Sequence, residues 1–127
     1  MNDEQYLAYC QQQLSSFAED LCKRTEHLPE GDSLRGLALA FGSLAKGERE
    51  LYSEGPGLVS RLFTTYPDFA PSFPRDLLWF FGGDCLHFMP DQEIAVYQQL
   101  DDMRREACKR GETLDLRAAR SSLLGLQ

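Results

Sequence analysis

The sequence predicts an all-α protein, a single-domain bundle of about six helices around a central, aromatic-rich buried helix. Apolar residues recur three and four positions apart along most of the chain, which is the spacing of one face of a helix. Clusters of proline and glycine divide this pattern into segments of helical length. At 127 residues the chain has room for one domain, residues 1–127, and not comfortably for two.

The first helix is expected over residues 3–27. Its apolar stripe steps by three and four, and its opposite face carries acid-first ion pairs such as Glu19–Lys23. Pro29-Glu30-Gly31 ends it. The stripe consists of Leu7, Cys10, Leu14, Phe17 and Leu21.

A second helix is expected to begin at Asp32 or Ser33, since both are good N-cap residues. Leu37, Leu39 and Phe41 alternate as in a strand, but their alanine spacers favour helix. We expect this helix to include Leu51 and to end at Gly55-Pro56-Gly57, with a short third helix over residues 58–66.

Residues 67–74 hold three prolines and predict an extended, stiff loop. Pro74 then opens a helix that contains five consecutive apolar residues, 77–81. No single helix face holds five neighbours, so this segment is expected to be buried on most sides. A hairpin turned by Gly82-Gly83 is the alternative, and an apolar surface left open for a ligand or partner is a third reading.

A long helix is expected from Pro90 to Arg110, because proline suits its first position and acidic residues follow in its first turn. Its stripe includes Val96, Leu100 and Met103. A short closing helix is expected from Asp115 through Leu123.

Thirteen Lys and Arg face 20 Asp and Glu, giving a net charge of −7. This balance disfavours nucleic acid and anionic membrane surfaces as partners. The chain shows no signal-peptide pattern and no apolar run near the ~20 residues of a membrane span, so we expect a cytoplasmic protein with reduced cysteines. The basic residues gather near the end of the chain and predict a solvated face or a contact with an acidic ligand: Arg104, Arg105, Lys109, Arg110, Arg117 and Arg120.

Asp84, Cys85 and His87 form the one cluster that mixes an acid, a thiol and an imidazole. On a helix, residues two apart point about 200° from each other, so Cys85 and His87 cannot pair as nucleophile and base. Asp84 and His87 are three apart and can meet on one turn. The spacings typical of zinc sites, phosphate loops and hydrolases are absent, so we expect no catalytic residue, cofactor or metal, and we expect a solvated His27.

Residues 77–94, LLWFFGGDCLHFMPDQEI, resemble the central signature of a family of small uncharacterised proteins from pseudomonads and related gammaproteobacteria. The resemblance implies a bacterial cytoplasmic protein. It supplies no catalytic residue that could be carried over to this chain.

Two function classes follow from these observations. The first is a non-catalytic helical protein that acts by association, as a homodimer or as an adaptor to another protein, with Phe69, Phe73 and Trp79 as candidate interface residues. The alternative is a small-ligand or enzymatic pocket between helices, with Asp84, Cys85 and His87 on its wall.

Overall fold

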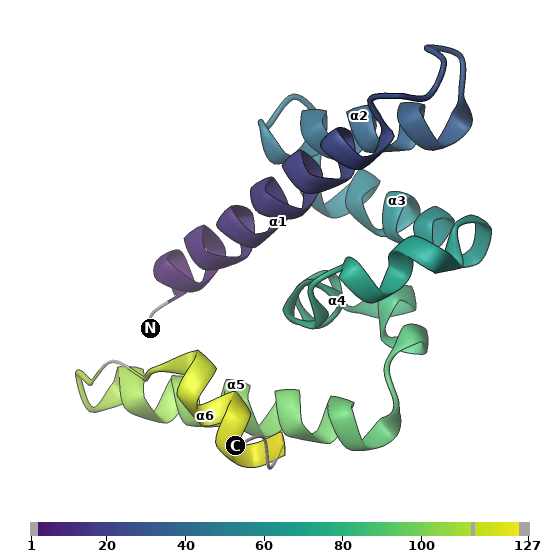
Figure 1. Ribbon diagram of the computed structural model, residues 1–127. Helices are drawn as coiled ribbons and strands as arrows, with labels where there is room; N and C mark the ends of the chain where they lie inside the picture. Colours follow the sequence, from purple (N-terminus) through teal and green to yellow (C-terminus); the bar gives the residue numbers. More distant parts are fainter. Residues whose placement is uncertain (1–2, 113, 125–127) are drawn as a thin grey trace. The chain divides into compact units, whose positions relative to one another are not determined.

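The computed structural model describes residues 3–112 and 114–124, and within these two ranges the protein is helical and has no strand (Figure 1). This confirms the all-α prediction. The helices are α1 (Asp3–Thr25), α2 (Ser33–Ala45), α3 (Leu51–Thr65), α4 (Arg75–Phe81), α5 (Asp91–Lys109) and α6 (Leu116–Leu124), with two 3₁₀ helices, η1 (Pro67–Ser72) and η2 (Gly83–Phe88).

The chain forms two compact units. The larger comprises residues 10–88, and the smaller comprises residues 1–9 together with residues 89–127. Helix α1 therefore contributes its first turns to the smaller unit and the rest of its length to the larger. The prediction of one domain stays a prediction, and the two units are described one at a time.

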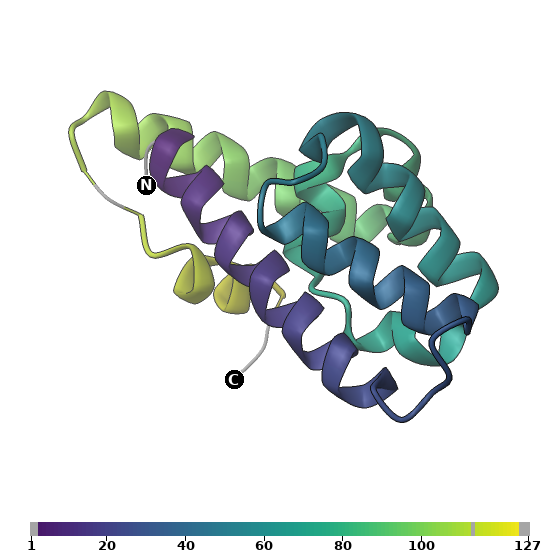
Figure 2. The same ribbon diagram turned by 90° about the horizontal axis from the view of Figure 1, so that it is seen from above.

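Helices α1, α2 and α3 lie side by side in the larger unit (Figure 2). Its core consists of side chains from these helices, from α4 and from the segment that leads into α4. The ring of Phe17 stands edge-on to Phe41 and to Phe73, with ring centroids 5.3 and 4.9 Å apart. Edge-to-face rings pair the positive edge of one ring with the negative face of another. Leu14, Phe17 and Leu21 are all buried, as the stripe on α1 predicts.

Asp32 caps α2 as expected: its Oδ1 accepts hydrogen bonds from the backbone N–H groups of Leu34 and Arg35, at 2.9 and 3.3 Å. The expected end of this helix is wrong. It stops at Ala45, and Gly47 follows with φ of 81°, a left-handed conformation that favours glycine. Leu51 begins α3 instead of ending α2.

Gly55-Pro56-Gly57 lies inside α3, although the sequence predicts a break there. The first turn is held by Glu54, whose Oε2 accepts from the backbone N–H of Glu50 at 2.8 Å. Pro56 lacks the N–H that would bond the carbonyl of Tyr52, but the helix continues. Gly55 is buried, and the ring of Phe81 occupies the space where a side chain would stand.

The proline-rich segment is also more regular than expected. Residues 67–72 form η1 rather than an extended loop, since the φ that proline fixes also suits a 3₁₀ helix. Phe73 follows with its backbone N–H bonded to Ala70 O at 3.0 Å, and its side chain enters the core.

The apolar run 77–81 forms α4 and not a hairpin, and Gly82 and Gly83 turn the chain into η2 with φ of 63° and 50°. Leu77 and Leu78 are fully buried, which agrees with the expected burial. The three aromatic residues that follow are only half-buried: Trp79, Phe80 and Phe81.

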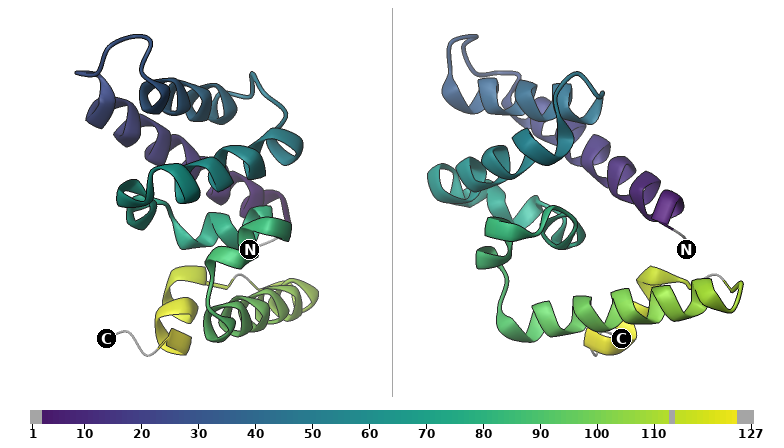
Figure 3. Two further views of the ribbon diagram at one scale, coloured as in Figure 1. Left: turned by 90° about the vertical axis from the view of Figure 1, so that its right-hand side faces the viewer. Right: turned by 180° about the vertical axis from the view of Figure 1, so that it is seen from behind.

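In the smaller unit α5 packs on α6 (Figure 3), and α5 also holds the first turns of α1. Arg104 on α5 is 6% exposed, and its Nη1 donates to Oδ1 of Asp3 at 2.8 Å. The guanidinium also lies over the ring of Tyr6, 4.8 Å from the centroid. None of the helices in the described part of the chain is long and apolar enough to cross a membrane.

Candidate functional site

The structure buries Cys85 and leaves Asp84 and His87 exposed. All three lie on η2, where the side chains of Asp84 and His87 are 96% and 80% exposed and Cys85 is 1% exposed. His87 Nε2 is 4.0 Å from Asp84 Oδ1, so the expected meeting of these two side chains is a loose contact at the surface. Cys85 faces the core, away from that contact.

The thiol of Cys85 is a poor nucleophile in this position. Burial, and to a smaller extent the negative charge of Asp84, raises the pKa of this thiol to about 11. Because the thiolate is the reactive form, very little of it is present at neutral pH. Cys85 therefore behaves as a small apolar core residue.

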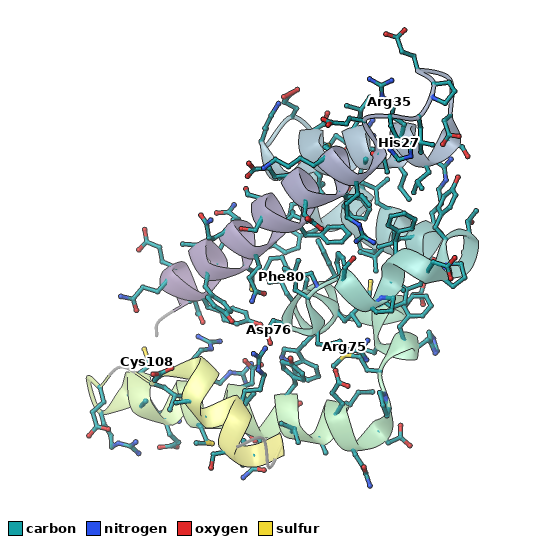
Figure 4. All side chains as sticks on the ribbon, viewed as in Figure 1. His27, Arg35, Arg75, Asp76, Phe80 and Cys108 are labelled. Atoms are coloured by element: carbon teal, nitrogen blue, oxygen red, sulfur yellow. The ribbon has the colours of Figure 1, made fainter. Side chains whose placement is uncertain are left out.

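The three candidate interface residues occupy different environments. Phe73 is 1% exposed and packs against Phe17, so it does not belong to a contact surface, and its assignment is corrected to the core. Phe69 is half-buried under Arg24, whose guanidinium carbon lies 4.6 Å from the ring centroid. Trp79 is half-buried on α4, the helix on which Arg75, Asp76 and Phe80 are labelled in Figure 4.

The basic residues near the end of the chain are largely neutralised by acidic neighbours. Arg105 lies 3.6 Å from Asp101, as the acid-first spacing predicts. The side chain of Arg117 lies outside the described residues. Further ion pairs join Arg104 to Asp3 and Asp101, Lys109 to Glu106, and Arg110 to Glu112. Arg105, Lys109 and Arg110 are exposed, as a solvated face predicts, whereas Arg104 is buried and the prediction is wrong for that residue.

A groove between α1 and α2, within the larger unit, is the feature that the sequence-based reasoning missed. Its volume is about 480 Å³. A second hollow of about 270 Å³ adjoins it and shares Glu19, Cys22 and Leu39 with it. The groove is lined largely by small residues of both helices: Ser15, Ala18, Cys22, Gly42, Ser43 and Ala45.

The wall of this groove on α2 is unusually apolar for a surface. No charged residue lies between Arg35 and Lys46, and Leu39 is 58% exposed. A Cβ on Gly42 would meet no atom within 4 Å, so the space above this glycine is open. The sequence held one signal for this surface. Leu37, Leu39 and Phe41 alternate, and on a helix three apolar residues two apart cannot all face one core, so one of them must point away from it.

The groove has few groups that could do chemistry. Cys22 lines it, and its Sγ donates to Ala38 O at 3.4 Å. Across residues 3–112 and 114–124, no group of three or more His, Cys, Asp or Glu side chains is placed to hold a metal ion. His27 is exposed just beyond α1, close to the Arg35 end of α2 (Figure 4).

A family model described as PA2817-like matches residues 4–127, nearly the whole chain. The match agrees with the resemblance carried by residues 77–94. No curated protein and no solved structure matches the chain.

Proposed function

We propose that this chain, which belongs to the PA2817-like family, acts by association with another protein chain, and that the α1–α2 groove is its contact surface. The observation that carries the proposal is Leu39, which is 58% exposed on the groove wall of a helix without charge from residue 36 to residue 45. Removing an exposed leucine from water by contact with a partner lowers the free energy of the complex.

The shape of the groove suits a helical partner. Ala18, Gly42 and Ala45 have little or no side chain, so the backbone of a docked helix can come close to α1 and α2. An amphipathic helix laid in an apolar groove is a common mode of protein recognition, in which side chains three and four apart serve as anchors. Leu39 would contact the apolar stripe of that helix.

The alternative function, a ligand or enzymatic pocket around Asp84, Cys85 and His87, has less support. A cysteine nucleophile needs a lowered pKa and an accessible sulfur. The thiol of Cys85 has a raised pKa and is 1% exposed, while Asp84 and His87 lie outside in solvent.

The test is photo-crosslinking in cells that naturally express the gene. A photoreactive amino acid replaces Leu39 in one variant and Ser43, also in the groove, in a second. The control variant carries it at Arg61, which is exposed on α3 outside the groove. Irradiation is followed by mass spectrometry of the adducts.

The proposal predicts an adduct with one defined polypeptide from positions 39 and 43 and not from position 61. That polypeptide is either a second copy of the chain or another protein, and its identity follows from the mass spectrum. If positions 39 and 43 give no more adduct than position 61, the groove is not a contact surface and the proposal fails.

A further inference from the structure

We draw no further inference here: the strongest candidate, the apolar groove between α1 and α2 with Leu39 exposed on its wall, belongs to the site already described, and nothing among the described residues shows whether a second copy of the chain or another protein covers it.

Discussion

A methyl group added to Gly55 of α3 would lie 2.8 Å from Cζ of Phe81 on α4, closer than two carbon atoms can come without one of them moving. The absence of a side chain at Gly55 thus permits the close approach of α3 and α4. The same glycine belongs to the cluster that the sequence-based reasoning took for a helix end. Its position in a helix is explained by the ring that packs on it.

Gly55→Ala is therefore expected to lower the free energy of unfolding by about 1–3 kcal/mol, the usual cost of overfilling a packed site. Gly57→Ala is the matched control. It should be neutral or stabilising by up to ~1 kcal/mol, because alanine favours helix and its Cβ meets nothing. Urea unfolding measures both. Adding Phe81→Leu should reduce the cost of Gly55→Ala, and equal costs in both backgrounds would contradict the proposed clash.

Phe73 and Phe69 should differ sharply when each is replaced by alanine. Phe73→Ala removes a ring from the centre of the core and should cost about 3–5 kcal/mol in thermal or urea unfolding. Phe69→Ala removes a half-buried ring and its contact with Arg24, and about 1 kcal/mol or less is expected. Similar losses at the two positions would contradict the assignment of Phe73 to the core and of Phe69 to its edge.

The thiols should react with a disulfide reagent at very different rates. Cys108 is exposed and should be modified at the rate of a free thiol, whereas buried Cys85 should wait for opening of the fold. Peptide mass spectrometry after timed quenching assigns each rate. If native Cys85 is modified as fast as Cys108, its sulfur is accessible and its assignment to the core is wrong.

The raised pKa of Cys85 also predicts a dependence of stability on alkaline pH. The pKa of this thiol has its ordinary value of 9.0 in the unfolded chain and rises to about 11 in the folded protein. Between these values the folded state holds the proton and the unfolded state has lost it, so stability falls as pH rises. The free energy of unfolding, measured with urea, should fall less from pH 9 to 11 in Cys85→Ala than in wild type. Equal falls in the two proteins would contradict the raised pKa of Cys85.

The contact between Asp3 and Arg104 predicts that stability also depends on pH in the acid range. The hydrogen bond and the positive charge of Arg104 hold the pKa of Asp3 below its ordinary value. A carboxyl of this kind stabilises the folded state above its unfolded pKa of about 3.9, and the contribution is lost as pH falls through the lower folded value.

Arg104→Lys should raise the Asp3 pKa toward the ordinary value, because lysine offers a smaller and more mobile donor. A ¹³C titration of the Asp3 carboxyl measures the change. Arg24→Lys, which alters an arginine paired with Asp20 elsewhere, is the control and should leave the Asp3 titration unmoved. Titration of Asp3 at its ordinary pKa in the wild-type protein would contradict the hydrogen bond between Asp3 and Arg104.

Periodicity and caps were enough to predict most of the helices. The stripe through Leu14 and Phe17 and the cap at Asp32 depend on residues close together in the sequence, and both are confirmed. One error arises where a distant residue decides, because Gly55 lies in a helix against the ring of Phe81. The other is local: the φ that proline fixes suits both an extended loop and the 3₁₀ helix that residues 67–72 form.

The candidate site was less predictable, because a groove depends on how two helices are spaced. The sequence shows three apolar residues on one helix, Leu37, Leu39 and Phe41. It does not show that the core takes Leu37 and Phe41 and that no other helix of the described chain covers Leu39. Asp84, Cys85 and His87 drew attention by their residue types. Burial turns the central one inward, and residue type alone does not predict burial.

The composition of the smaller unit has a consequence for folding during synthesis. Residues 10–88 leave the ribosome as a complete unit before α5 emerges from it. Asp3 and Tyr6 emerge first of all, yet their partner Arg104 follows about a hundred residues later. A nascent chain stalled before α5 has emerged is therefore expected to carry a folded middle and an undocked start.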